Sequence, residues 1–138
     1  MTIIHKNKTI SCLLSSTLGA TGAHRFYLYG MRDFWAWTHF IATLCSLMAI
    51  MFITSYPDFF LALPLIFSII SGFIEALVIG LTSDEKWDNL HNCQSEIQSR
   101  SRWSLALLLV VIFGVGAVTM IGTIARTFDL LYSEGAFG

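Results

Sequence analysis

Three long apolar segments constrain this chain more than any other feature. Residues 33–54, 57–81 and 103–125 consist mostly of aliphatic and aromatic side chains and hold very few charges. Each is long enough to cross the hydrocarbon core of a bilayer as a helix, which takes about 20 residues. Backbone polar groups find no water inside lipid, so such segments must be helical. The sequence therefore predicts an all-α, polytopic membrane helix bundle.

The composition agrees with a membrane protein and argues against several other classes. Only 12% of the 138 residues are charged, against about 25% in soluble domains. The net charge of −1 provides no basic surface for nucleic acid, so no nucleic-acid partner is expected. Cys12, Cys45 and Cys93 are not clustered, and we expect neither a disulfide framework nor a zinc site or other cofactor.

A fourth, shorter and less apolar segment covers about residues 9–28. Its most specific feature is a seam of small residues four positions apart, formed by Ser11, Ser15, Gly19 and Ala23. This spacing places the seam on one helix face, where a second backbone can approach closely. We expect a short first membrane helix that packs against another and crosses the membrane, with partial insertion as the alternative. The bundle then has four membrane helices.

Two residues indicate where the second and third helices begin and bend. Asp33 directly precedes the second apolar segment, where a side-chain oxygen can cap the free N–H groups of a helix. Pro64 lies inside the segment 57–81. Because proline lacks an N–H group and its ring crowds the preceding turn, we expect a kink at that position.

The only long polar stretch covers residues 82–102. It begins with Thr82-Ser83-Asp84-Glu85, which is typical of a capping box, so a helix is expected from about residue 83. Trp87, Leu90 and Ile97 fall near one side of that helix. We interpret it as a cytoplasmic amphipathic helix on the membrane surface, with a solvated loop as the alternative. The chain thus divides into a membrane domain over 1–92 and a linker, additional helix and short tail over 93–138.

A basic and aromatic turn connects the first two membrane helices. Its residues are Arg25, Phe26, Tyr27, Arg32, Asp33, Trp35 and Trp37. Aromatic rings favour the depth of the lipid headgroups, and arginine can extend its guanidinium toward water from there. We expect this turn to lie at the membrane surface and to contact lipid or a partner protein.

The distribution of Lys and Arg predicts the orientation. The loop 24–33 carries two arginines and the loop 82–102 carries three cations, whereas the turn 55–58 carries none. Cytoplasmic loops hold an excess of Lys and Arg, so both loops are expected in the cytoplasm and the C-terminus outside. Lys6 and Lys8 join the poorer side if the first helix crosses fully, and the richer side if it does not. The side of the N-terminus therefore stays open.

Several motifs give the chain a family resemblance. Gly22-Ala-His-Arg-Phe-Tyr-Leu28, followed by Gly30, resembles the signature of the two-transmembrane (TM-2) domain family, called NINE proteins in bacteria. Ile74-Glu75-Ala76 and the segment 81–92 are similar to the acidic helix and tail of bacterial members, and residues 5–9 to one bacterial subgroup. The resemblance covers about residues 5–92. It implies an integral protein of the bacterial inner membrane and does not imply an enzyme.

Glu75 is the most informative polar residue, because an unpaired carboxylate inside a membrane is costly. It lies within the third helix, and Arg25, Arg32 and His39 approach from the same predicted side of the membrane. Glu75, Arg25, His39 and His24 form the candidate polar site. One interpretation makes these four residues a proton or cation site. The other makes Glu75 a partner in an ion pair that locks helices together, with Arg25 as the expected partner.

No arrangement of residues in the sequence predicts catalysis. A nucleophile with a neighbouring base is absent, and the histidines lack the HxxxH and HExxH spacings of metal sites. We therefore expect a non-enzymatic membrane scaffold or modulator that binds lipid, a membrane protein or a second copy of itself. The alternative is a proton- or cation-coupled carrier or channel subunit that uses Glu75 and His39 in an oligomer.

Overall fold

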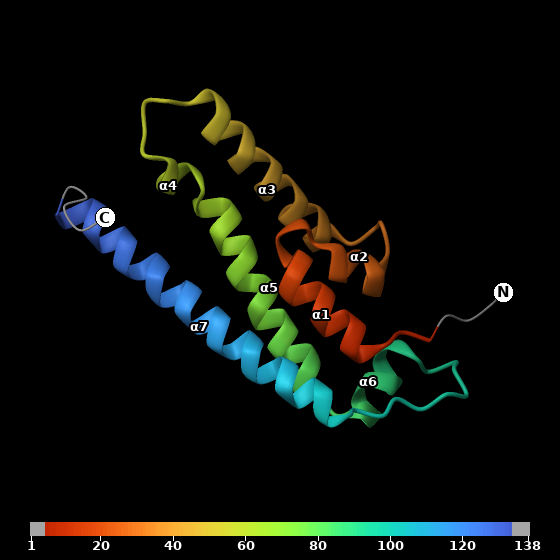
Figure 1. Ribbon diagram of the computed structural model, residues 1–138. Coiled ribbons are helices and arrows are strands. Elements are labelled where there is room, and N and C mark those ends of the chain that lie inside the picture. Colours follow the sequence, from red (N-terminus) through yellow and green to blue (C-terminus); the bar gives the residue numbers. More distant parts are fainter. Residues whose placement is uncertain (1–4, 134–138) are drawn as a thin grey trace.

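The computed structural model describes residues 5–133, and this part of the chain contains helices and loops but no strand (Figure 1). Its elements are α1 (Lys8–Leu18), the 3₁₀ helix η1 (Gly19–Thr21), α2 (Ala23–Tyr29), α3 (Phe34–Phe52), α4 (Asp58–Leu61), α5 (Leu63–Leu81), α6 (Asp84–His91) and α7 (Trp103–Tyr132). Within residues 5–133, α3, α5 and α7 are the three helices long and apolar enough to cross a membrane. The all-α class and the membrane character are thus confirmed.

Helix α5 occupies the centre of the bundle, and α1, α3 and α7 pack around it (Figure 1). The backbone of α1 and η1 lies very close to the backbone of α5 at Gly72. A Cβ atom added to Gly72 would lie 2.7 Å from the carbonyl oxygen of Ser15 and 2.8 Å from the Cα of Gly19. The Ser15 hydroxyl donates to the Gly72 carbonyl at 2.8 Å. Of the small-residue seam, Ser11, Ser15 and Gly19 are buried here, whereas Ala23 lies beyond the helix and is half-buried.

The prediction of one continuous first helix over 9–28 is wrong. Helix α1 has 11 residues and is therefore about 16 Å long, roughly half the thickness of the hydrocarbon core. Gly22 then adopts φ 70°, a left-handed conformation that glycine takes without steric cost. A side chain at Gly22 would also meet the carbonyl oxygen of Ala36 at 2.5 Å. The chain reverses there, so that α1 and α2 form a helical hairpin.

Both ends of this hairpin lie at the same end of the bundle (Figure 1). The ammonium group of Lys6 donates to the carbonyl of Leu28 at the end of α2. The backbone N–H of Asn7 donates to the hydroxyl of Tyr27 at 3.1 Å. These contacts return the end of α2 to the beginning of α1, so this segment enters the bundle and leaves it on one side.

Pro64 breaks the third predicted helix instead of kinking it. The segment 57–81 forms the short α4 and the long α5, separated at Ala62, and Pro64 lies in the first turn of α5. A proline at this position cannot donate to the carbonyl of Phe60 four residues earlier, and its ring would clash with that carbonyl. The chain therefore starts a new helix just before the proline.

Helices α6 and α7 also depart from the predicted bounds. Ser83 caps α6 by accepting from the N–H of Lys86 at 3.4 Å, as predicted, but the helix ends at His91. Trp87 is buried and its indole donates to the Lys6 carbonyl at 3.0 Å. Helix α7 continues seven residues past the predicted end at 125 to Tyr132. The remainder of the predicted tail, 134–138, and residues 1–4 lie outside the described residues.

Candidate functional site

The structure brings the four predicted intramembrane polar residues into one cluster around Glu75. Arg25 donates from Nη1 to Oε1 of Glu75 at 3.1 Å. His24 hydrogen-bonds through Nε2 to the other carboxylate oxygen, and Nε2 of His39 lies 3.9 Å from Oε1. Glu75 itself is about 9 Å from the end of α5, counted at 1.5 Å per residue. The carboxylate on α5 is thus contacted from α2 and from α3.

The hairpin turn is the reason that His24 and Arg25 reach α5. Gly22 begins α2, so these two side chains fall in its first turn, next to the centre of the bundle. From the other side, Asp33 accepts from Nε of Arg25 at 2.7 Å and from Nη2 at 3.4 Å. The hydrogen bond from Arg25 lowers the pKa of Asp33 below its usual range. The guanidinium therefore bridges two carboxylates.

Asp33 has a second role that the sequence predicts correctly. It is the N-cap of α3, and its Oδ2 accepts from the N–H of Ala36 at 2.8 Å. A capping aspartate satisfies a free N–H of the first turn and places negative charge where the helix dipole favours it. Because the same carboxylate holds Arg25, the start of α3 and the polar cluster are fixed together.

Hydroxyl groups that the sequence analysis overlooked extend the cluster along α3 and α5. Nδ1 of His39 pairs with the hydroxyl of Ser68. Ser68 is also within 3.3 Å of the carbonyl of Ala20, to which Thr43 donates at 2.6 Å. The spacing of Ser68 and Glu75, seven residues apart, places them on one face of a helix and could have identified Ser68.

His24 is the most enclosed member of the cluster. Its side chain is completely buried, and its ring centroid is 6.2 Å from that of His39 in an edge-to-face arrangement. Nδ1 of His24 has no hydrogen-bond partner among residues 5–133. The ring therefore contributes to the cluster through Nε2 alone.

A groove of about 480 Å³ lies beside the cluster, between α3 and α5. Its polar wall includes Thr38, His39, Ser68 and Glu75, and Phe67 on α5 contributes an apolar wall. The groove thus provides a partly polar path from the outer surface of α3 and α5 to the carboxylate.

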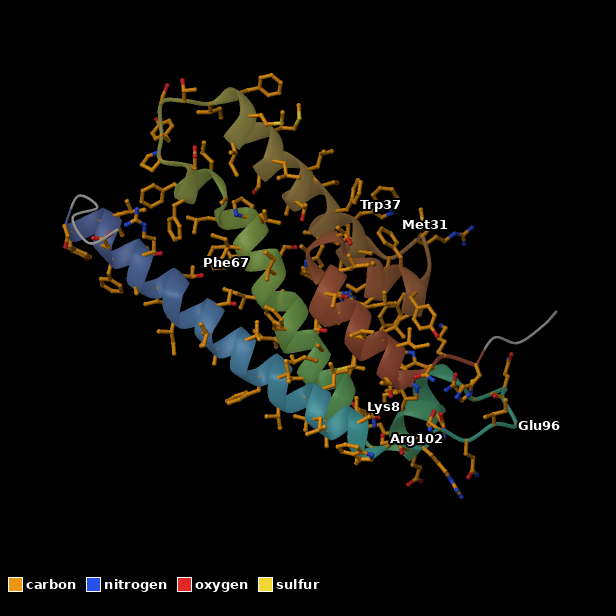
Figure 2. All side chains as sticks on the ribbon, in the orientation of Figure 1. Lys8, Met31, Trp37, Phe67, Glu96 and Arg102 are labelled. Carbon is orange, nitrogen blue, oxygen red and sulfur yellow. The ribbon has the colours of Figure 1, made fainter. Side chains whose placement is uncertain are left out.

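The predicted basic and aromatic turn separates into an inner and an outer part. In the inner part the rings of Phe26 and Trp37 pack edge to face, with their centroids 5.5 Å apart. The Trp37 indole N–H donates to the carbonyl of Met31 at 2.9 Å (both residues are labelled in Figure 2). In the outer part Arg32 is exposed and Trp35 is 59% exposed. Arg32 makes no ion pair or side-chain hydrogen bond in the described part of the chain. These outer side chains are free to contact a neighbouring molecule.

Positive charge is concentrated at one end of the bundle. Lys8 contacts the carbonyl of Thr82, and the ring of Tyr29 lies 5.8 Å from that of His91. The N-terminal segment, the loop after α2, α6 and the loop 93–102 therefore meet at this end (Figures 1 and 2). These segments, the first turn of α1 and α2 hold every lysine and arginine of the chain except Arg126.

Comparison of the chain with models of protein families, with curated proteins and with solved structures finds no match. Within residues 5–133, no group of three or more His, Cys, Asp and Glu side chains is placed to hold a metal ion.

Proposed function

We propose that this protein is a non-catalytic scaffold or modulator of the bacterial inner membrane, held in shape by the cluster around Glu75. The observation that carries the proposal is the engagement of both carboxylate oxygens by side chains from outside α5. A carboxylate inside a membrane requires partners, and partners on separate elements hold those elements together. The same residues in a transport site would need to release the carboxylate during each cycle.

The proposed topology has three crossings, α3, α5 and α7, and a fourth membrane element, the α1–α2 hairpin, inserted from the cytoplasmic side. The end that gathers seven of the eight lysines and arginines faces the cytoplasm, following the excess of positive charge in cytoplasmic loops. This end includes the loops 24–33 and 82–102, and α6 lies there as the amphipathic surface helix. The turn 53–57 and the far end of α7 face outward.

The outer part of the basic and aromatic turn is the proposed contact surface. Arg32, Phe34 and Trp35 are exposed at the cytoplasmic end of α3. Arginine next to aromatic rings suits the headgroup layer, where the ring rests among lipids and the guanidinium reaches phosphate. We assign this surface to lipid headgroups or to a membrane-protein partner, including a second copy of the chain.

We also propose kinship with the TM-2 family. The two sequence segments that carry the resemblance contact each other: His24 and Arg25 belong to the first, and Glu75 to the second. These two motifs lie about 50 residues apart in sequence, yet they meet in one ion-pair cluster. This contact supports the interpretation that both belong to one domain.

Co-purification tests the scaffold. Wild-type protein and Arg32→Gln/Trp35→Ala are extracted in mild detergent, and bound proteins and lipids are identified by mass spectrometry. The matched control is Tyr56→Ala, which removes an exposed aromatic ring at the other end of α3. The proposal expects a partner or lipid at fixed stoichiometry that the turn variant loses and the control keeps. Equal binding to all three proteins would contradict it.

The groove that reaches Glu75 and His39 favours a second candidate, a proton- or cation-coupled carrier or channel subunit in an oligomer. Vesicles reconstituted with wild-type protein and with Glu75→Gln, in equal amounts and with equal helix content, decide between the two. Ion flux in the wild type that Glu75→Gln abolishes would support the carrier and contradict the scaffold. Background flux in both, with lower stability of Glu75→Gln, supports the scaffold.

A further inference from the structure

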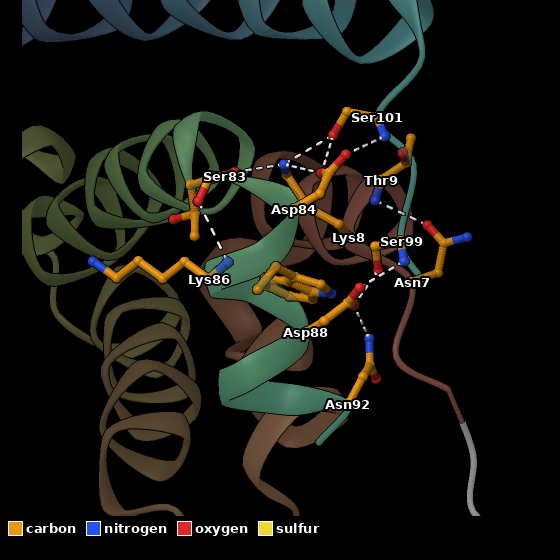
Figure 3. Close-up of polar contacts among 12 residues, drawn as sticks. Asn7, Lys8, Thr9, Ser83, Asp84, Lys86, Asp88, Asn92, Ser99 and Ser101 are labelled. Carbon is orange, nitrogen blue, oxygen red and sulfur yellow. Dashed lines mark hydrogen bonds and ion pairs between the residues drawn. The ribbon is translucent and has the colours of Figure 1, made fainter. Parts of the chain in front are cut away.

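A second polar network, separate from the one around Glu75, joins α1 to the chain on both sides of α6 (Figure 3). Lys8 is 6% exposed, although it is a lysine in the first turn of a helix. Its ammonium donates to the carbonyl of Thr82, to Oδ1 of Asp84 at 2.8 Å and to the hydroxyl of Ser101 at 2.9 Å. All three N–H bonds of Lys8 are therefore used within the protein.

Asp84 is equally well engaged. It accepts from Lys8, from the N–H of Ser101 at 2.6 Å and from the Ser101 hydroxyl. Burial raises the pKa of Asp84, but the hydrogen bonds from Lys8 and Ser101 outweigh burial and lower it to about 2. Lys8 and Asp84 thus form an ion pair with no net charge, and the hydrogen bonds of both side chains are made within the protein.

A cavity of about 550 Å³ lies against the ion pair of Lys8 and Asp84, between the N-terminal segment and residues 97–104. Its wall carries Lys8, Arg100 and Arg102 as cations against one carboxylate, Asp84. In the described part of the chain Arg100 and Arg102 make no ion pair or side-chain hydrogen bond. Two arginines without a partner in the described residues therefore line the cavity, and its one lining carboxylate, Asp84, is paired with Lys8.

Further hydrogen-bond donors line the same cavity. Thr9 and Ser104 also line it, and their hydroxyls make no hydrogen bond to any residue within 5–133. Arg102 is the N-cap of α7 but supplies no capping side chain. The N–H of Leu105 donates to the carbonyl of Arg102 at 2.9 Å, which leaves the N–H groups of Trp103 and Ser104 without a partner within the helix. Guanidinium, hydroxyl and helix N–H groups together match an oxyanion, above all phosphate, which arginine binds through paired hydrogen bonds.

We propose that this cavity binds the phosphate of an anionic phospholipid headgroup. The lipid source is argued from position and depends on the proposed topology. The cavity is lined by Arg102 and Ser104, which flank Trp103 at the start of α7. Trp103 is 77% exposed, and an exposed Trp beside arginines is typical of the water–lipid boundary. The site is distinct from the basic and aromatic turn, which shares none of its residues.

Binding to the purified full chain in neutral detergent tests the site. The probes are dihexanoyl phosphatidylglycerol, inorganic phosphate and the zwitterionic dihexanoyl phosphatidylcholine. Arg100→Gln/Arg102→Gln removes the two free cations, and Arg102→Gln alone removes one of them. The matched control for Arg102→Gln is Lys86→Gln, which removes one exposed cation from the same end of the bundle, outside both the cavity and the basic and aromatic turn. Because all three side chains are exposed, these variants should fold.

Phosphatidylglycerol should bind the wild type more tightly than phosphatidylcholine. Loss of two charge-assisted contacts should weaken phosphatidylglycerol binding by about tenfold or more in Arg100→Gln/Arg102→Gln, and by a smaller factor in Arg102→Gln. The control should change by less than about twofold, because surface charges outside the site are screened. If inorganic phosphate binds as tightly as phosphatidylglycerol, and the arginine substitutions weaken both equally, the site binds free phosphate and the lipid assignment is wrong. Absence of binding, or equal losses in Arg102→Gln and Lys86→Gln, would overturn the proposal.

These outcomes are independent of the proposed scaffold role. A scaffold that loses its partner through the turn variant can still bind phosphate at Arg100 and Arg102. Conversely, loss of phosphate binding with intact partner binding would remove only the lipid site.

Discussion

Glu75 is held by Arg25 across the gap between α5 and α2, and this pair yields the first prediction at the scale of single residues. Glu75→Ala and Arg25→Ala should each lower the free energy of unfolding by about 1–3 kcal/mol, because each leaves a partly buried charge without its partner. The double variant should cost clearly less than the sum. Unfolding of the detergent-solubilised protein with sodium dodecyl sulfate measures all three.

The control for this cycle is Arg32→Ala, which removes an exposed arginine that has no partner in the described residues. It should change the free energy of unfolding by less than about 0.5 kcal/mol. Strictly additive effects of Glu75→Ala and Arg25→Ala would show that the two side chains do not stabilise the fold as a pair.

Asp84 provides a prediction of pH dependence. Its pKa is lowered from the ordinary 3.8 to about 2 in the folded protein, so the folded state holds this proton less tightly than the unfolded chain. The resulting stabilisation is complete above pH 3.8 and is lost as the pH falls through about 2. Asp84→Asn should be less stable at neutral pH and should lose less stability between pH 4 and pH 2, measured by thermal unfolding in detergent. A variant with the same acid dependence as the wild type would contradict the assignment.

At this scale the sequence predicts charge pairing better than hydrogen-bond partners. The pairing of Glu75 with Arg25 follows from their depth in the membrane, since a buried carboxylate needs a cation nearby. The contact between Ser68 and His39 depends on the rotation of α3 and α5 about their axes, which no local pattern specifies. The burial of Lys8 could not be predicted from the sequence either, because the fold alone brings its acceptors on Thr82 and Asp84 next to it.

At the scale of helices, the contact of α1 with α5 depends on the absence of a side chain at Gly72. Gly72→Ala would place a Cβ at 2.7 Å from the carbonyl oxygen of Ser15 and should force the helices apart. The expected cost is about 1–3 kcal/mol of unfolding free energy. Gly122→Ala on α7, where nothing lies within 4 Å, should cost nothing and should gain slightly from helix propensity. Equal effects would contradict the close approach of α1 and α5.

The long elements were predictable from the sequence and the short ones were not. Apolar length alone identifies α3, α5 and α7, because only a helix satisfies the backbone inside lipid. The hairpin of α1 and α2 depends on Gly22, whose positive φ has no counterpart in the hydrophobic pattern. Two glycines within four residues, Gly19 and Gly22, are the signal that could have suggested a turn.

At the scale of the whole molecule, the hairpin favours one answer to the question of which side of the membrane holds the N-terminus. If α1 and α2 enter and leave on one side, Lys6 and Lys8 belong with the other cations, and the charge asymmetry becomes seven to one instead of five to three. The asymmetry then arises from the same turn that carries His24 and Arg25 to Glu75. The proposed topology and the polar cluster therefore both depend on one reversal of the chain.

Cysteine labelling in intact bacterial cells tests that reversal most directly. Single-cysteine proteins are made with Cys93 alone, or with His5→Cys, Met31→Cys or Ser55→Cys in a chain whose native cysteines are replaced by alanine. A membrane-impermeant maleimide should label position 55 in intact cells, and positions 5, 31 and 93 only after permeabilisation. Labelling of positions 31 and 93 from opposite sides, or of position 5 from the same side as position 55, would contradict the hairpin and the fold built on it.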